Sequence, residues 1–220
     1  MKKNRWLIFI TVAAACGLMT LVELVIQPGY VVKSLCKIGL FGGSVGLYWL
    51  YTRDPALREM FRLSSLRQAV WMGLGVYGLL LLGFWLLRPL LDLQTIARDL
   101  LSTEKITAGN FLPVALYISL CNSFLEEVFF RGFAYLTLRR HGSEVMARIF
   151  SAGAFSLYHV GILHGWFSLW LFLLALAGLF VGGLLFDFLD RRGSLYPSWL
   201  VHGSANLAIN TVGLFMFGFL

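Results

Sequence analysis

Charged side chains are scarce in this chain of 220 residues. Asp, Glu, Lys and Arg make up 13% of it, against about 25% in soluble globular proteins. Hydrophobic residues reach 59%, and so few charges could not cover that much apolar surface in water. The 15% of aromatic residues excludes disorder, because disordered chains are poor in aromatics and rich in charge. The composition therefore predicts a membrane protein that crosses the bilayer several times.

Cysteine is also scarce. The three cysteines, Cys16, Cys36 and Cys121, lie in apolar stretches, and no two of them form a CxxC pair. This number and spacing are not typical of a disulfide framework or of a cysteine-based metal site. We interpret all three as buried packing residues.

Long apolar runs are what the chain has in abundance, and a membrane-spanning helix needs roughly 20 such residues. The runs are Trp6–Ile26, Tyr30–Tyr51, Ala69–Leu87, Phe111–Leu138, Val145–Leu163, Phe167–Leu189 and Leu195–Leu220. They predict an all-α transmembrane bundle of about seven spans. Three pairs of glycines with small-xxx-small spacing predict close helix packing in lipid. These pairs are Gly39/Gly43, Gly42/Gly46 and Gly178/Gly182.

Basic residues are divided unevenly between the two faces that alternating spans create. Twelve of the 18 lie on the N-terminal side: Lys2, Lys3, Arg5, Arg53, Arg58, Arg62, Arg67, Arg139, Arg140, Arg148, Arg191 and Arg192. The opposite side receives Lys33, Lys37, Arg88, Arg98 and Lys105. Because cytoplasmic loops carry an excess of Lys and Arg, we predict a cytoplasmic N-terminus. The net charge of +7 is then a topology signal, and we expect no nucleic-acid partner.

Polar residues inside the predicted spans gather in the C-terminal half of the chain. They are Glu126, Glu127 and Arg131 in span four, His159 in span five, and His202 and Asn206 in span seven. An ionisable group in a span costs some 2.5–3.5 kcal/mol on insertion scales, so it indicates a functional site. Glu23 in span one stands alone near the external end, and we interpret it as an interfacial or packing residue.

Spacing and depth connect these residues. Glu127 and Arg131 are four residues apart, the favourable order for an ion pair on one helix face. Glu126 is turned about 100° away and lacks that partner. Glu126, His159 and His202 lie 13, 11 and 10 residues from the nearest arginine of the cytoplasmic face. At about 1.5 Å per residue, all three reach a common depth of roughly 15–20 Å.

This set of groups suits hydrolysis of an amide bond. A carboxylate in apolar surroundings can serve as a general base, and a histidine can share the proton. A second histidine and an asparagine on one helix face can donate to a developing oxyanion. Water then attacks directly, and no Ser or Cys nucleophile is needed.

Three motifs carry a resemblance to a known family. They are Glu126-Glu127-xxx-Arg131, Phe155-xxx-His159 and His202-xxx-Asn206, in this order on separate spans. They resemble the motifs of the CPBP family, the CAAX prenyl endopeptidases and their bacteriocin-processing relatives, also called the Abi family. The flanking residues agree, in Phe130-Arg131-Gly132 and in Ser194-Leu195-Tyr196-Pro197-Ser198. The resemblance covers about Asn122 to Leu207, and the first three spans carry no family signature.

The resemblance implies an intramembrane endopeptidase whose catalytic core is residues 111–220. Residues 1–110 then supply N-terminal spans and an external connector within one membrane domain. Glu126 would activate water with help from His159, and His202 and Asn206 would stabilise the oxyanion. Glu127 and Arg131 would form a structural ion pair. The expected partners are the lipid bilayer and a membrane-associated protein or peptide, whose scissile bond enters between spans four, five and seven. We expect a plasma-membrane protein with its site towards the cytoplasm.

Several alternatives stay open at this point. Members of this family are described both as metalloproteases and as metal-free glutamate enzymes, and Glu126, His159 and His202 could supply a three-ligand zinc site. The chain has no HExxH motif, which pairs two histidines on one helix, and we favour a reaction without a metal cofactor. Intramembrane Glu and His also build proton-coupled transporters, although we find no internal repeat with matching broken helices. A non-catalytic scaffold or immunity protein is the third alternative, and interhelical polar packing is the simplest one.

Overall fold

The computed structural model describes residues 2–219, which contain helices and connecting segments and no strand. The side chains of Lys2 and Lys3, and Leu220 at the end of the last predicted span, lie outside the described residues. The prediction of an all-α membrane protein is confirmed, because five of the described helices have the length and hydropathy of a membrane span. They are Asn4–Ile26, Arg67–Leu90, Ala108–His141, Glu144–Leu163 and Leu169–Arg192.

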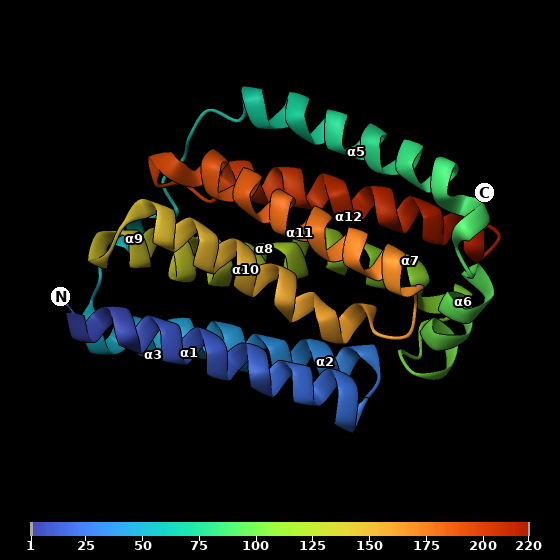
Figure 1. Ribbon diagram of the computed structural model, residues 1–220, viewed down its shortest axis with the longest axis horizontal. Coiled ribbons are helices and arrows are strands. Elements are labelled where there is room, and N and C mark those ends of the chain that lie inside the picture. The colour runs from blue at the N-terminus through green and yellow to red at the C-terminus, as the bar shows by residue number, and fades with distance from the viewer. Residues whose placement is uncertain (1, 220) are drawn as a thin grey trace.

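The long helices lie side by side along the longest axis of the molecule (Figure 1). The first three are α1 (Lys2–Leu21) with η1 (Val22–Ile26); α2 (Tyr30–Lys37), η2 (Ile38–Gly42) and α3 (Gly43–Thr52); and α5 (Arg67–Leu87) with η3 (Arg88–Leu90). The central one is α7 (Ala108–Tyr117), η4 (Ile118–Asn122), α8 (Ser123–Glu126), η5 (Glu127–Thr137) and α9 (Leu138–His141). The last three are α10 (Glu144–Leu163), α11 (Leu169–Leu189) with η6 (Asp190–Arg192), and α12 (Tyr196–Met216). The segments η1, η2, η4 and η5 are π-helical, whereas η3 and η6 are 3-10 turns.

Two of the seven predicted spans form helices in the structure but are not among the five helices with the length and hydropathy of a membrane span. Tyr30–Thr52 is a continuous helix through α2, η2 and α3, and α12 covers the last predicted span. The number of seven spans therefore stays a prediction, although the helices themselves are present.

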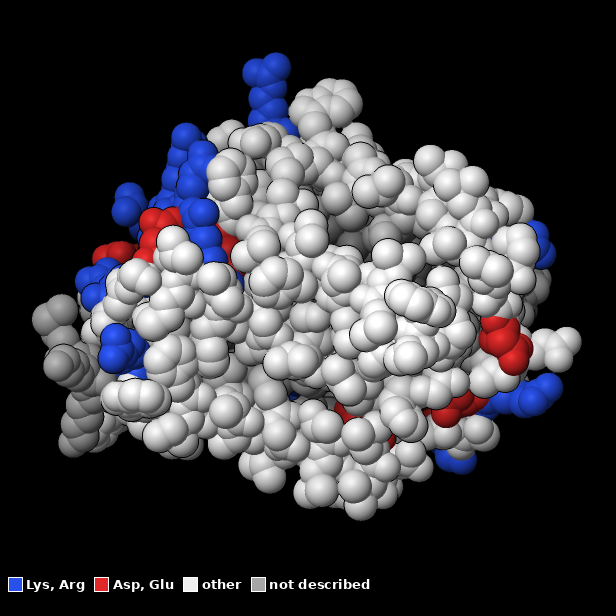
Figure 2. Space-filling view, in the orientation of Figure 1, with Lys and Arg blue, Asp and Glu red and all other residues white. Residues whose placement is uncertain are grey.

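One end of the bundle, which we call the basic end, holds the connections that the charges assigned to one face. There, Arg139 donates to the backbone oxygen of Arg191 (2.7 Å), and His141 Nε2 lies 2.9 Å from Asp54 Oδ2. The short helix α4 (Ala56–Glu59) lies here too, and the Leu195 amide donates to the Met60 oxygen (3.0 Å). Figure 2 shows most of the visible Lys and Arg side chains gathered at this end. The alternation predicted from the charges is therefore present, and its cytoplasmic orientation stays a prediction.

The opposite end, which we call the connector end, is covered by α6 (Leu93–Ser102), a short helix within the expected connector. Asp92 caps this helix by accepting from the Thr95 amide (3.0 Å). Hydrogen bonds from the Thr95 side chain and backbone lower the pKa of Asp92. Trp166 Nε1 donates to Asp99 Oδ2 (2.7 Å), which ties the connection between α10 and α11 to α6.

The core lies around η5, whose side chains are nearly all buried. This segment carries aromatic residues around its whole circumference, which is typical of a helix enclosed on every side. Phe129 stacks on Phe41 of η2 with ring centroids 4.0 Å apart, and Phe130 meets Tyr158 of α10 at 5.9 Å. The central helix is therefore fixed between helices from both halves of the chain.

The predicted glycine contacts are wrong within the described residues. A Cβ added at Gly178 or Gly182 would meet no heavy atom within 4 Å. The close approach is at Gly183, where a Cβ would lie 2.9 Å from Ala152 Cα. Of the other predicted glycines, Gly39, Gly43 and Gly46 face open space as well, and Gly42 makes an ordinary contact. The reason is helical phase, since one residue turns the side chain by about 100°.

The cysteine prediction is correct only in part. All three cysteines are free thiols, but Cys121 is exposed, and Cys16 and Cys36 are only partly buried. Cys121 lies on the exposed face of η4, which no other described part of the chain covers. A membrane helix is apolar on both its packed and its lipid-facing sides, so an apolar stretch did not predict burial here.

Candidate active site

Glu126 and Glu127 lie where α8 meets η5 in the middle of the central helix. Glu126 is 2% exposed and Glu127 is fully buried. Charged groups at such depth are stable only when they are paired and hydrogen-bonded. The partners of these two carboxylates come from the central helix itself, from α2 and from α12, and they define the site.

Glu127 forms the ion pair that its spacing predicts. Arg131 Nε lies 3.3 Å from Glu127 Oε2, and neither side chain is exposed. The Arg131 guanidinium also lies 4.3 Å from the ring centroid of Phe155 and 4.9 Å from that of Phe186. The two neighbouring rings, whose centroids are 6.2 Å apart, help to keep the guanidinium in place through cation–π attraction.

Asp187 of α11 is a second partner of Arg131 that the sequence analysis missed. Its Oδ1 lies 3.7 Å from Arg131 Nε and accepts a hydrogen bond of 2.9 Å from Ser151. Asp187 is an ionisable residue inside a predicted span, so the rule that selected the glutamates would also have selected it. The arginine is therefore shared between two carboxylates.

His202 of α12 connects the two glutamates. Its Nδ1 lies 2.7 Å from Glu127 Oε1, and because an ionised carboxylate only accepts, Nδ1 carries the proton. Its Nε2 lies 3.6 Å from Glu126 Oε2, which is beyond hydrogen-bond length. The sequence placed Glu126 and Glu127 on different faces, yet both reach this one imidazole, because its two nitrogens point in different directions.

Glu126 has a cationic partner that was assigned to the opposite face. Lys37 of α2 is 8% exposed, and its Nζ donates to Glu126 Oε1 (3.0 Å) and to Asn122 Oδ1 (2.7 Å). Asn122 Nδ2 donates to the same Glu126 oxygen (3.0 Å). Counting Lys37 as a charge of the external face was wrong. A lysine eight residues into a predicted span gives no sequence signal of the helix that it will meet.

Glu23 stands alone in its predicted span, but in the structure it too has a charged partner. Its Oε2 lies 2.7 Å from the Nζ of Lys33, which also donates to Glu104 of the connector. This second buried lysine lies one turn before Lys37 on α2. It joins α1, α2 and the connector end and makes no contact with Glu126 among the described residues.

His159 and Asn206 approach the site from α10 and α12. His159 Nδ1 donates to the Phe155 backbone oxygen (2.7 Å), which leaves Nε2 as an acceptor in the neutral ring. The Phe155 ring lies between the two histidines, 4.6 Å from His159 and 5.6 Å from His202. Asn206 Nδ2 donates to the Ile118 oxygen (3.2 Å). The structure thus joins the carboxylates, Arg131 and His202 directly, and places His159 and Asn206 at the edges.

The position of His202 depends on a close fit between α12 and η4. A Cβ on Gly203 would lie 2.9 Å from the Ser119 oxygen. Trp199 Nε1 donates to the Leu120 oxygen (2.9 Å), and Asn210 Nδ2 donates to the Ala115 oxygen (3.0 Å). Side chains of a neighbouring helix satisfy backbone groups that an irregular membrane helix leaves free. The π-helical segment η4 therefore helps to hold α12, which carries His202 and Asn206.

The three expected zinc ligands are not gathered into a metal site. Within residues 2–219 no three His, Cys, Asp or Glu side chains form a group that could hold a metal ion. Glu126 Oε1 lies against an ammonium group, and a cation repels a second cation. His202 faces a carboxylate with each of its nitrogens. Among the described residues Glu126 Oε2 and His159 Nε2 keep free lone pairs, so a metal-dependent reaction stays an alternative.

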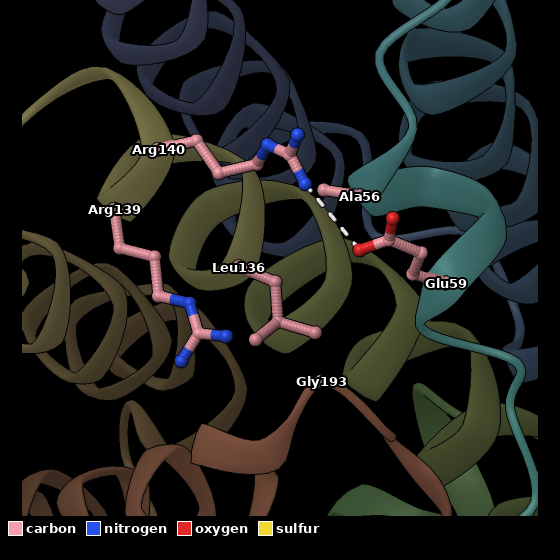
Figure 3. A pocket seen from close by; sticks show the side chains of 6 residues that line it. All are labelled: Ala56, Glu59, Leu136, Arg139, Arg140 and Gly193. Atoms are coloured by element: carbon pink, nitrogen blue, oxygen red, sulfur yellow. Dashed lines mark hydrogen bonds and ion pairs between the residues drawn. The ribbon is translucent and has the colours of Figure 1, made fainter.

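Two hollows lie near the central helix. A small pocket at the basic end is lined by Ala56, Glu59, Leu136, Arg139, Arg140 and Gly193 (Figure 3). An apolar groove of about 440 Å³ lies between η2, α3, α4 and η5. It is lined by Gly42, Val45, Gly46, Trp49, Leu57, Arg58, Met60, Phe61 and Val128. The groove reaches Val128, two residues beyond Glu126, from the side of the second predicted span.

The fold and the buried ionisable site define an integral membrane protein with a reactive centre enclosed between its helices. Residues 108–208 match the family described as type II CAAX prenyl endopeptidase Rce1-like. This match confirms the resemblance to the CPBP family over the part of the chain that carries the three motifs, and it includes all six predicted site residues. At family level the match supports a CAAX-protease-like intramembrane endopeptidase. The comparison with curated proteins gave no match, and neither did the comparison with solved structures.

Proposed function

We propose that this protein hydrolyses a peptide bond of a membrane-associated protein or peptide with water activated by Glu126. The observation that carries the proposal is that the two carboxylate oxygens of Glu126 have different partners. Oε1 accepts from Lys37 and Asn122, whereas Oε2 faces His202 Nε2 at 3.6 Å. Oε2 is the oxygen left to take a proton from water.

The reaction follows from these positions. The water oxygen forms a bond to the carbonyl carbon, and its proton passes to Glu126 Oε2 as general base. The carbonyl oxygen becomes an oxyanion. Glu126 then delivers the proton to the amide nitrogen, the carbon–nitrogen bond breaks, and the products are a carboxylic acid and an amine. His159, with Nε2 as a free acceptor, assists by sharing the proton.

Glu127 serves the oxyanion through His202 in this mechanism. Its hydrogen bond to Nδ1 fixes the orientation of the ring, as a buried carboxylate does in hydrolytic triads. Protonated Nε2 then donates to the oxyanion. Asn206 contributes its second amide hydrogen, because the contact with Ile118 uses only one. This role of Glu127 goes beyond the structural ion pair expected from the sequence.

We further propose that the reaction needs no metal cofactor, and that the substrate approaches with an apolar segment in the groove beside Val128. The ammonium group of Lys37 on Glu126 Oε1 supports the first point, because a cation beside the carboxylate disfavours the binding of a second one. The apolar lining of the groove supports the second. Entry between spans four, five and seven, which the sequence suggested, stays the alternative route. We keep the proposal that the site faces the cytoplasm of the plasma membrane.

Cleavage of a peptide library in detergent micelles tests the proposal. The library includes prenylated peptides that end in cysteine, two aliphatic residues and a variable residue. Glu126→Gln should lower the rate roughly 100- to 10,000-fold, the usual contribution of a general base. Glu144→Gln, a half-exposed carboxylate at the basic end, is the matched control and should cleave as the wild type does.

Cleavage by Glu126→Gln at the wild-type rate would refute the mechanism. The same preparation separates the two chemistries when it is stripped with a chelator and its zinc content is measured. We expect full activity with much less than one zinc per chain. Loss of activity that returns on addition of zinc would contradict the metal-free proposal.

A further inference from the structure

Lys37 is a buried cation that comes from outside the family-matched segment. It lies on α2, whereas the family match begins at residue 108. An ammonium group with so little exposure costs several kcal/mol of desolvation unless carboxylates and dipoles compensate it. A lysine placed there needs a reason that packing alone does not supply.

The contacts of Lys37 form a closed set around one oxygen. Lys37 Nζ and Asn122 Nδ2 each lie 3.0 Å from Glu126 Oε1, and Lys37 Nζ lies 2.7 Å from Asn122 Oδ1. The same ammonium lies 5.1 Å from the ring centroid of Tyr158 on the opposite side, within the range of a cation–π contact. With Oε1 fixed in this way, the carboxyl group cannot rotate freely, and Oε2 keeps its direction towards His202.

The excess of negative charge in the site also points to Lys37. Glu126, Glu127 and Asp187 are three carboxylates, and Arg131 is the only guanidinium that contacts them among the described residues. A cluster with such an excess of negative charge is unstable in low dielectric. Lys37 supplies a cation at the carboxylate that Arg131 does not contact.

We propose that Lys37 is a positioning residue of the hydrolytic reaction, which holds Glu126 by Oε1 so that Oε2 receives the proton of water. This inference rests on the proposed function of Glu126. It makes the N-terminal helices part of the active site, although their sequence carries no family motif.

Two lysines on one helix provide a matched experiment. Lys37→Met should lower kcat roughly 100-fold, the effect of misplacing a catalytic group by about 1 Å, with KM changed less than about threefold. Lys33→Met removes the other buried lysine of α2, which contacts Glu23 and Glu104 instead, and should keep kcat within about threefold. The probe is the library peptide that the wild type cleaves fastest. A wild-type or raised kcat in Lys37→Met overturns the inference, and so does an equal loss in both variants.

A stability measurement keeps the inference testable when activity is lost through misfolding. In detergent, Lys37→Met should lower the unfolding midpoint by roughly 10 °C in the wild-type background, because it leaves Glu126 buried without its cation. In a Glu126→Gln background the same substitution should cost less than half as much. Equal losses in both backgrounds refute the contact.

The two proposals fail in different ways. Retained cleavage by Glu126→Gln overturns the proposed function and, with it, the role of Lys37. An inactive Glu126→Gln together with a fully active Lys37→Met overturns only the role of Lys37.

Discussion

At the scale of single residues, Arg131 is among the largest fully buried side chains of the described residues. It lies against two carboxylates and contacts the rings of Phe155 and Phe186. None of its guanidinium nitrogens has a hydrogen bond of good geometry among the described residues. The attraction is therefore mainly electrostatic, and it depends on the low dielectric of the core.

Loss of this guanidinium should destabilise the fold. Arg131→Met leaves Glu127 and Asp187 buried without a cation, and breaking a buried pair from one side costs about 3–5 kcal/mol. Arg148→Met is the control, because its pair with Glu144 is partly exposed and such pairs contribute less than about 1 kcal/mol. Reversible unfolding in mixed micelles measures both free energies. Similar values for the two variants would show that the buried network contributes little.

Single residues also show how far a motif predicts geometry. The spacing of Glu127 and Arg131 predicts their pair correctly, because four residues make about one helical turn. The contact of Glu127 with His202 joins residues 75 positions apart, and no local rule contains it. The motif identified the participants, and packing decided which atoms meet.

At the scale of elements, α10 and α11 approach each other where Gly183 faces Ala152. A Cβ at Gly183 would lie 2.9 Å from the Cα and from the Cβ of Ala152, and 3.3 Å from Arg131 Nη2. The close approach of these helices therefore places the guanidinium as well as the backbone. Hydrophobicity alone cannot show which of several glycines in α11 faces its neighbour.

Substitution of neighbouring glycines tests this contact. Gly183→Ala should cost about 1–3 kcal/mol of stability by overpacking and should lower cleavage by displacing Arg131. Gly182→Ala should change stability by less than about 0.5 kcal/mol, because a Cβ there meets no heavy atom within 4 Å. Reversible unfolding of the two variants is the measurement. A larger loss in Gly182→Ala would contradict the observed helical phase.

For the whole molecule, the two ends differ in charge and in their connections. The basic end gathers the loops after α3, α9 and α11, whereas the connector end is covered by α6. The Lys and Arg at the basic end predict that it faces the cytoplasm. The position of the site towards the cytoplasm stays a prediction.

Cysteine labelling measures this orientation. In a background without Cys16, Cys36 and Cys121, Gln94→Cys at the connector end should react with a membrane-impermeant maleimide in intact cells. Glu59→Cys at the basic end should react only after the membrane is opened. Both positions are exposed, so access depends on the side of the membrane. The reverse pattern would invert the topology and place the site towards the outside.

The sequence by itself determined the class of this protein and predicted residues of its site. Apolar runs long enough to span a bilayer require helices, because backbone groups in lipid must be hydrogen-bonded within their own segment. Polar residues at one depth marked the site because their burial is costly. Both conclusions rest on local composition and spacing, which the chain carries in its order of residues.

Only the tertiary structure decided which residues from other helices contact the groups of the site. Lys37 reached Glu126, Asp187 reached Arg131, and Gly183 replaced the predicted glycines as the close contact. Each of these depends on the rotation of one helix relative to another, and in lipid the apolar side chains that face lipid and those that face protein look alike. The sequence therefore names the reactive groups, whereas the packing of helices from both halves of the chain sets their charge and direction.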